Sequence, residues 1–360
     1  MTGSDPLRIL CLSNMYPGPA DPDYGAFVEV MCGAIERAGH HVERVVIDTR
    51  ARGPLRTPAK YTGLAARALG RTRRADVIYA HYLFPTGAIA AASGRLFGRP
   101  WVITAHGRDV RNLQNPRLRA LTAPAVEGAA AIIAVSEYLA EELRASGLQL
   151  PAVHVANMGV DLERFRPADR AAARARLGLG SGPLVLAVGR LTERKNPLRL
   201  LQAFQLVCRA HPEATLAVVG EGPLAGAIRA GAVRYGLDGA VVMPGALPNT
   251  QVAEWMAASD VLALPSLVEP LGVVALEALA SGRPVVATRV GGVVEVVGQG
   301  GVTVDPLDPA AIADGLLRLI ARPPSPAVCR TAAERHGVDR QAARVVAVLE
   351  AATQGSSVNN

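Results

Sequence analysis

The sequence predicts an α/β protein built from two doubly wound parallel-sheet domains. Along the chain, short runs rich in Val and Ile alternate with longer segments rich in Ala and Leu, and this alternation occurs in two successive sets. Buried parallel strands joined by crossover helices have this pattern. The length of 360 residues agrees with two domains, because one domain usually takes about 100 to 200 residues.

Six strands are predicted in each set. The first six span residues 7–13, 42–48, 76–80, 100–105, 130–136 and 152–157. The second six span residues 183–189, 214–220, 240–245, 261–266, 283–289 and 301–305. Two successive sheets with helices on both faces follow from this order.

The domain boundary is expected in the segment 161–182, which is rich in Arg, Pro and Gly. We therefore expect an N-terminal domain of residues 1–165 and a C-terminal domain of residues 166–335. Residues 336–360 hold a helix, predicted over 341–352, and a polar tail whose composition predicts disorder. We expect this helix to cross back to the N-terminal domain.

Hydropathy and cysteine spacing bear on where the protein works. No stretch approaches the roughly 18 to 20 unbroken apolar residues of a membrane span, and the first seven residues lack a signal peptide's apolar region. We therefore expect a cytoplasmic protein. Its four cysteines, Cys11, Cys32, Cys208 and Cys329, lack the paired spacing of a zinc site or a redox dithiol. They are expected to be reduced structural thiols.

The net charge of +7 is distributed unevenly, because residues 50–74 contain eight basic residues and no acid. Lys60, Arg67, Arg71 and Arg74 recur there at spacings of seven, four and three beside an apolar stripe, which predicts a basic amphipathic helix. Two interpretations stay open: a surface helix packed on its own domain, or a contact site for an anionic membrane surface or an anionic acceptor. Nucleic acid is not an expected partner, because no set of aromatic residues alternates with the charges.

Polar residues follow several predicted strands, at the sheet edge where open parallel sheets bind ligands. His81 follows one strand of the first set and His106 follows the next. A lone histidine is more often a structural hydrogen-bonding group, and this is the interpretation for His81. For His106 a structural and a ligand-binding role stay equally open, because Gly107 and two charged residues accompany the imidazole.

The second set carries two further candidates. Arg190 and Lys195 lie in the turn after the strand 183–189, where they converge on a diphosphate or form a solvated basic loop. The segment Glu269–Glu277 places two carboxylates eight positions apart, and Gly272 opens an apolar run that predicts a helix. The free N–H groups of that helix start suit a phosphate or sugar oxygen. Taken alone, the two acids also fit exposed helix positions or a glycosidase pair.

These motifs occur together in a known family. The chain resembles the retaining GT-B glycosyltransferases of glycosyltransferase family 4, and its N-terminal half looks most like enzymes of the teichuronic acid biosynthesis type. Besides the turn with Arg190 and Lys195, the resemblance rests on Asn14–Pro17, Tyr24–Phe27, Ala80–Pro85, Thr104–Asp109, Val135–Glu137, Asn157–Asp161, Gly220–Leu224, Ala258–Leu262, Glu269–Glu277 and Ser281–Val286.

The resemblance implies two Rossmann-like domains that face each other across a cleft. It implies that Arg190 and Lys195 neutralise the donor's diphosphate and that Glu277 accepts hydrogen bonds from the donor ribose. Glu269 would face the transferred sugar, and His106 would reach that sugar from the other domain. The amides near Gly272, Val273 and Val274 would supply further donors. Many relatives have paired glycines after the first strand, of which only Gly25 is present here, with an implied place near the phosphates.

The implied reaction moves a sugar from a nucleoside diphosphate sugar to an acceptor hydroxyl with retention of configuration. The expected acceptor is a glycan or a lipid-linked molecule of cell-surface polysaccharide or glycolipid synthesis, which would place the protein peripherally on the inner face of the membrane. No cofactor and no metal are expected, since the sequence lacks an Asp-x-Asp cluster. A sugar-nucleotide epimerase and a noncatalytic, membrane-associated sugar-nucleotide-binding protein remain alternatives. A dinucleotide-dependent oxidoreductase is not, because Gly-x-Gly-x-x-Gly is absent after the first strand.

Overall fold

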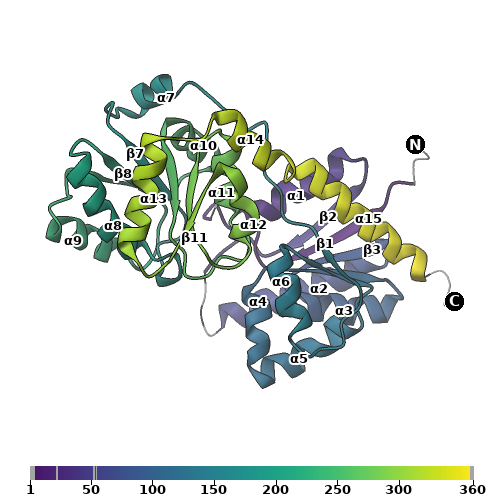
Figure 1. Cartoon of the computed structure of the whole chain (residues 1–360). Coiled ribbons are helices and arrows are strands. Elements are labelled where there is room, and N and C mark those ends of the chain that lie inside the picture. The colour runs from purple at the N-terminus through teal and green to yellow at the C-terminus, as the bar shows by residue number, and fades with distance from the viewer. Residues whose placement is uncertain (1–4, 22, 52, 54, 357–360) are drawn as a thin grey trace. The chain divides into compact units, whose positions relative to one another are not determined.

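The computed structural model describes residues 5–21, 23–51, 53 and 55–356. The chain divides into two compact units (Figure 1). Unit 1 comprises the chain as far as Gly159 together with the C-terminal segment that begins at Val338. Unit 2 comprises Val160–Gly337. Within the described residues, no helix is both long enough and apolar enough to cross a bilayer.

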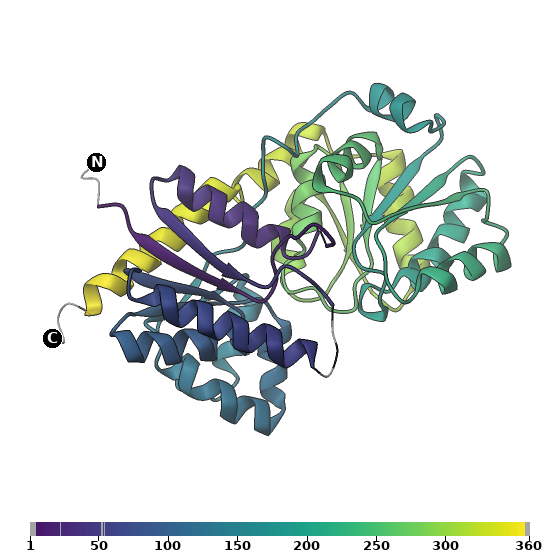
Figure 2. The same cartoon turned by 180° about the vertical axis from the view of Figure 1, so that it is seen from behind.

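Unit 1 is a parallel sheet of six strands in the order β2-β1-β3-β4-β5-β6. Its strands are β1 (Arg8–Ser13), β2 (His41–Val46), β3 (Val77–His81), β4 (Trp101–Ala105), β5 (Ala131–Ala134) and β6 (Val153–Val155). Its helical segments are α1 (Ala26–Arg37), α2 (Arg56–Thr72), α3 (Thr86–Phe97), α4 (Arg108–Arg111), η1 (Asn112–Gln114), α5 (Pro116–Glu127), α6 (Glu137–Arg144) and α15 (Val338–Ser356). Helix α15 packs along α1 on one face, and α2, α3 and α5 line the other (Figures 1 and 2).

Unit 2 is a second parallel sheet of six strands, in the order β12-β11-β10-β7-β8-β9. Its strands are β7 (Leu184–Val188), β8 (Thr215–Val219), β9 (Val241–Gly245), β10 (Val261–Leu264), β11 (Val285–Thr288) and β12 (Gly301–Val304). Its helical segments are α7 (Arg170–Leu177), η2 (Glu193–Lys195), α8 (Pro197–Ala210), α9 (Ala225–Arg234), α10 (Asn249–Ala258), α11 (Val273–Ala280), α12 (Val293–Val297), η3 (Gly298–Gly300), α13 (Pro309–Ala321) and α14 (Pro326–Glu334).

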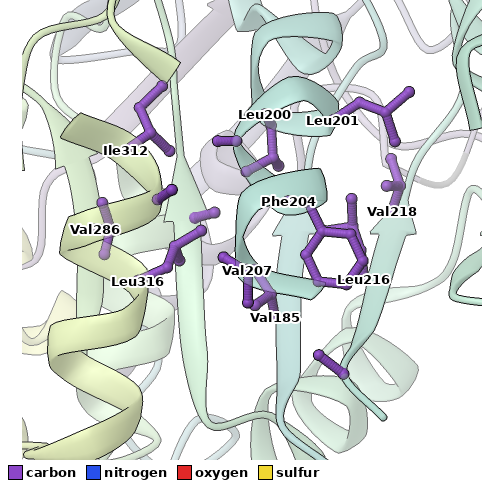
Figure 3. Packing of buried hydrophobic residues seen from close by; sticks show 14 of the residues in the cluster. Val185, Leu200, Leu201, Phe204, Val207, Leu216, Val218, Val286, Ile312 and Leu316 are labelled. Atoms are coloured by element: carbon purple, nitrogen blue, oxygen red, sulfur yellow. The ribbon is translucent and has the colours of Figure 1, made fainter. Parts of the chain in front are cut away.

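The core of unit 2 fixes the helix that follows the first strand of this unit. Phe204 of α8 is fully buried, and it belongs to one cluster with Leu216 of β8 and Leu316 of α13 (Figure 3). Helix α8 begins at Pro197, a residue suited to the first helical position because its missing N–H would have no partner there. The packing of α8 and α13 on the same sheet face thus holds the turn before Pro197 in a defined place.

The predicted fold class, two doubly wound parallel sheets, is confirmed. All twelve predicted strands are present, with ends that differ by at most two residues. The C-terminal helix is longer than predicted: it continues through Ser356 into the segment for which composition predicts disorder, while residues 357–360 lie outside the described part of the chain. That helix belongs to unit 1.

Candidate functional site

The candidate site of unit 2 lies where its strand order reverses. Strand β7 pairs with β8 on one side and with β10 on the other, so the loops after β7 and β10 leave the sheet in opposite directions. Ligands of doubly wound sheets bind at this switch point, outside the carboxyl ends of the strands. The loop after β7 carries Arg190 and Lys195, and the loop after β10 carries Glu269 and Gly272.

The loop after β7 is built on close backbone contacts with the loop after β8. Gly189 and Leu191 donate their N–H groups to the carbonyls of Val219 and Glu221, each at 2.9 Å. A Cβ atom at Gly220, whose φ is +136°, would lie 2.0 Å from the Gly189 carbonyl oxygen. Only glycine therefore fits at position 220. This contact holds the start of the Gly220–Leu224 segment against the turn that carries Arg190 and Lys195.

A pocket opens against this loop. Its lining includes Gly189, Arg190, Lys195 and Pro265. Arg190 is exposed, and its guanidinium has no hydrogen-bond or ion-pair partner among the described residues. A free guanidinium at the mouth of a pocket is suited to bidentate recognition of a phosphate.

Lys195 and Glu269 form an ion pair across the switch point. The Lys195 Nζ lies 2.5 Å from the Glu269 Oε2, and the two residues are 74 positions apart in the chain. Glu269 is buried, with 7% of its surface exposed. Ser266, which is fully buried, donates its hydroxyl to the same Oε2 at 2.9 Å. Sequence reasoning missed Ser266, although it ends the predicted strand 261–266 and could have been found by asking which polar residues end a strand.

Gly272 sets the start of α11. Its backbone is left-handed, with φ +87° and ψ +56°, and a Cβ there would lie 2.9 Å from Val293 Cγ2. The carbonyl of Gly272 accepts the first helical bond, from Ala275 at 2.9 Å. The N–H groups of Val273 and Val274 precede that bond and therefore lack acceptors within the helix. They make the start of α11 a set of hydrogen-bond donors at the same loop as Glu269.

Glu277 lies in the second turn of α11 and is partly buried. Its carboxylate has no hydrogen-bond or ion-pair partner in the described part of the chain. Burial raises the pKa of Glu277 to about 8, while the positive charge of Arg164 opposes the shift. A carboxyl that is desolvated without a partner is the kind of group that a ligand's hydroxyls satisfy.

His106 of unit 1 belongs to a small aromatic cluster after β3 and β4. Its Nε2 lies 3.1 Å from the Nδ1 of His81, and its ring packs against Phe27 and Tyr82 at centroid distances of 5.2 and 4.6 Å. His81 is fully buried, and its Nε2 has no partner in the described chain. Burial lowers the pKa of His106 to about 3, and burial together with His106 lowers that of His81. Both rings are therefore neutral at pH 7.

Asp109 fixes the backbone that carries His106. Its carboxylate accepts the N–H groups of Leu83, His106 and Gly107 at 3.0, 3.0 and 2.8 Å. These bonds join the loop after β3 to the loop after β4, so the structural and ligand-binding interpretations of His106 are compatible. Burial raises the pKa of Asp109, and the three N–H donors oppose that shift.

Gly25 begins α1 in unit 1 with a left-handed backbone, φ +73°. A Cβ at this position would lie 2.4 Å from the Met15 carbonyl oxygen, so the loop after β1 can close here only over glycine. Strand β1 pairs with β2 and β3, where the strand order of unit 1 reverses. Gly25 and His106 thus lie on loops at the carboxyl ends of β1 and β4, in a unit separate from Arg190, Lys195, Glu269 and Glu277.

The basic residues of the predicted amphipathic helix lie on and after α2, and three of the four have partners in unit 1. Lys60 donates to the carbonyls of Thr49 and Ala51, and Arg67 donates to that of Val46 at 2.8 Å. Arg71 pairs with Glu43 at 2.5 Å. Arg74, just after the helix, is exposed. The surface-helix interpretation accounts for the first three.

All four cysteines are free, and the described residues contain no group of three or more His, Cys, Asp or Glu side chains arranged to hold a metal ion.

Comparisons with known proteins agree with this geometry. The chain matches the family described as Glycosyltransferase Family 4 over residues 13–164 and the family described as Glycosyl transferases group 1 over residues 169–336. It is 33% identical over 306 residues to the D-inositol 3-phosphate glycosyltransferase 1 of Catenulispora acidiphila, covering 78% of this chain and 73% of that protein. It is 34% identical over 328 residues to the D-inositol 3-phosphate glycosyltransferase of Thermobispora bispora, covering 84% and 74%.

Solved structures share the fold. The sucrose-phosphate synthase of Thermosynechococcus elongatus superposes with a TM-score of 0.74 at 24% identity, covering 98% of both chains. The Anabaena protein HepE, in a complex with UDP-glucose, superposes with a TM-score of 0.71 at 22% identity, covering 98% of this chain and all of that one.

Proposed function

Because the chain belongs to the family 4 glycosyltransferases of the GT-B fold, we propose that it transfers a sugar from a nucleoside diphosphate sugar to an acceptor hydroxyl with retention of configuration. The observation that carries the proposal is the arrangement at the switch point of unit 2. There, a free guanidinium, an ion-paired lysine and a buried carboxylate lie on the loops after β7 and β10.

In the proposed donor site, Arg190 and Lys195 neutralise the diphosphate and stabilise the nucleoside diphosphate as it leaves. Arg190 has no internal partner to give up. Lys195 has three N–H donors and can keep Glu269 while it contacts a phosphate. Glu277 accepts the ribose hydroxyls, and the N–H groups of Val273 and Val274 face the phosphate or sugar oxygens.

His106 is proposed as a hydrogen-bond partner of the transferred sugar, and Gly25 as the place where backbone approaches the phosphates closely. The neutral state of the His106 ring supports its part, since a neutral imidazole can donate to one hydroxyl without attracting a counter-ion. The place of Gly25 at the start of α1 supports its part, because the first N–H groups of a helix suit a phosphate.

The proposed mechanism uses neither a protein nucleophile nor a metal. The Glu269 carboxylate is held by Lys195 and Ser266, so it is placed to accept a sugar hydroxyl rather than to attack carbon. Front-face attack assisted by the leaving phosphate then accounts for retention, in contrast to the double displacement of retaining glycosidases.

Two acceptor classes follow from different observations. The names of the two relatives above support a phosphorylated cyclitol. The sequence resemblance and the exposed Leu55, Arg73 and Arg74 around α2 support a lipid-linked or glycan acceptor at the inner face of a membrane.

One screen tests the proposal. Wild-type protein is heated with UDP-, GDP- and ADP-sugars, and the donor that raises the Tm is incubated with inositol 3-phosphate or with a lipid-linked sugar. We expect one base to raise the Tm, one acceptor class to give product, and the anomeric proton of the product to show retention, with or without EDTA. Epimerised donor in the absence of acceptor would identify an epimerase, and a raised Tm without turnover would identify a binding protein.

A further inference from the structure

Ser266 ties the Glu269 side chain to the frame of unit 2. Its hydroxyl reaches the Glu269 Oε2 at 2.9 Å, and the serine itself is fully buried. The backbone around it is anchored as well: the Ser266 carbonyl accepts the Thr288 hydroxyl, and the Leu267 N–H donates to the Arg194 carbonyl at 2.8 Å. The backbone of Ser266 is therefore held in place independently of the Glu269 side chain.

The two oxygens of Glu269 are in different situations. Oε2 accepts from both Ser266 and Lys195, at 2.9 and 2.5 Å. Oε1 has no hydrogen-bond or ion-pair partner among the residues that the structure describes, and it is not one of the buried polar atoms sealed from solvent. Glu269 is 7% exposed, and Oε1 is the carboxylate oxygen that remains to accept a hydrogen bond from a ligand.

The two groups that donate to Oε2, Lys195 and Ser266, differ in whether they also contact the donor substrate. In the proposed function, the Lys195 ammonium contacts the diphosphate as well as Glu269, so the carboxylate shares this cation with the phosphates. Ser266 contacts no phosphate in the proposed donor site, and its main-chain carbonyl accepts a hydrogen bond from the Thr288 hydroxyl. When the diphosphate is bound, the serine hydroxyl is the donor to Oε2 that serves Glu269 alone.

Resting on the proposed function, we propose that Ser266 is a positioning residue for the donor sugar: it fixes Glu269 so that Oε1 alone receives one hydroxyl of the transferred sugar. The serine touches no substrate atom. Ser266 therefore contributes to the affinity for the sugar and not to that for the nucleoside diphosphate, because Arg190, Lys195 and Glu277 make the phosphate and ribose contacts. This separates a positioning role from a merely structural one.

The test compares matched ligands with and without the sugar. Calorimetry measures the affinity for UDP and UDP-glucose, and for GDP and GDP-mannose, in wild type, Ser266→Ala and Ser266→Thr. We expect Ser266→Ala to weaken binding of the nucleotide sugar about tenfold, the loss of one hydrogen bond to a charged group, and to leave the nucleoside diphosphate within about twofold. Ser266→Thr keeps the hydroxyl and should restore most of the loss.

Equal weakening of both ligands by Ser266→Ala, or no change in either, overturns the proposal. If Ser266→Ala does not fold, Ser266→Cys is the alternative variant, because its thiol has a similar size and is a weaker hydrogen-bond donor. It should weaken the affinity for the nucleotide sugar by an intermediate factor and leave the affinity for the nucleoside diphosphate unchanged. Glu269→Ala tests the donor site itself. If it leaves both affinities unchanged, the proposed donor site is wrong. If it weakens only the nucleotide sugar while Ser266→Ala does not, the site stands and the role of Ser266 falls.

Discussion

His81 Nδ1 and His106 Nε2 share a single hydrogen bond of 3.1 Å inside unit 1, so one imidazole donates and the other accepts. Neither ring takes a second proton at neutral pH, because burial lowers the pKa of both. The pair therefore joins the carboxyl ends of β3 and β4 without adding charge to a buried site.

This pair predicts a loss of stability in mild acid. The pKa of His106 is lowered to about 3 in the folded protein from an ordinary 6.5, so the unfolded chain gains a proton as pH falls below 6.5 and the folded chain does not. Between pH 7 and pH 5 this should cost about 2 kcal/mol of unfolding free energy. Urea unfolding at both pH values measures it. His106→Asn should remove that part of the slope, whereas the exposed His154→Asn should keep it; a slope that His106→Asn leaves intact contradicts the prediction.

Because of Glu277, we expect a second contribution to the unfolding free energy, one that decreases as pH rises. Its pKa is raised from 4.5 to about 8, so the folded state holds a proton that the unfolded state has lost, and its contribution falls as pH rises through this window. Glu277→Gln should match wild type near pH 4.5 and be more stable at pH 7 by up to about 3 kcal/mol. Thermal unfolding at the two pH values decides. A variant that is less stable than wild type at pH 7 would mean that the carboxylate has a stabilising partner.

The same group predicts proton release when the nucleotide binds. Hydrogen bonds from two ribose hydroxyls favour the charged carboxylate, so binding should lower the pKa of Glu277 and release a proton near pH 7. Calorimetry in two buffers with different ionisation enthalpies measures the proton count directly. Glu277→Gln should bind more weakly and release none. Equal proton release by wild type and Glu277→Gln would assign the proton to another group.

Gly220 predicts a large effect of one methyl group. Alanine there would place Cβ 2.0 Å from the Gly189 carbonyl oxygen at a φ of +136°. We expect Gly220→Ala to lower the unfolding free energy by about 3 kcal/mol or more, and to weaken nucleotide binding because the Arg190 turn must shift. Gly226→Ala is the matched control, since its Cβ would meet no atom within 4 Å in α9. It should be neutral or slightly stabilising. Similar losses in both variants would show that the Gly189 contact does not matter.

The fold was predictable from the sequence because buried parallel strands carry an uninterrupted apolar signal. The strand order was not, since periodicity says nothing about neighbours: unit 1 places β1 between β2 and β3, whereas unit 2 places β7 between β8 and β10. Helix α15 was predicted too short because Gln354 and Gly355 are poor core residues, yet the helix continues through them to Ser356.

The candidate site was predictable where a residue type is unusual for its position. Arg190, Lys195 and Glu269 are charged residues in loops after apolar strands, and Glu277 is a charged residue within an apolar helix, so they were noticed. The family resemblance then supplied their expected roles. Ser266 was missed because a serine after a strand is ordinary, and its meaning depends on Glu269 turning back towards it. Asn157 shows the opposite case. Its position after a strand is typical of a ligand-binding residue. Its backbone N–H, however, donates to Gln341 Oε1 of α15 at 3.2 Å, so this residue helps to hold the C-terminal helix on unit 1.

The basic residues on and after α2 give a prediction that separates structure from membrane binding. Lys60 and Arg67 donate to backbone carbonyls between Val46 and Ala51, while Arg73 and Arg74 are exposed. Lys60→Met with Arg67→Met should lower the Tm by several degrees, because about 1 kcal/mol is lost for each hydrogen bond to a carbonyl. Arg73→Gln with Arg74→Gln should leave the Tm unchanged and reduce flotation with anionic liposomes, since each basic residue near such a surface contributes about 1 kcal/mol. Two results would contradict membrane binding: wild-type protein that does not float with the liposomes, or flotation at low salt that Arg73→Gln with Arg74→Gln leaves unchanged. Helix α2 would then be a surface helix whose basic residues contact only unit 1.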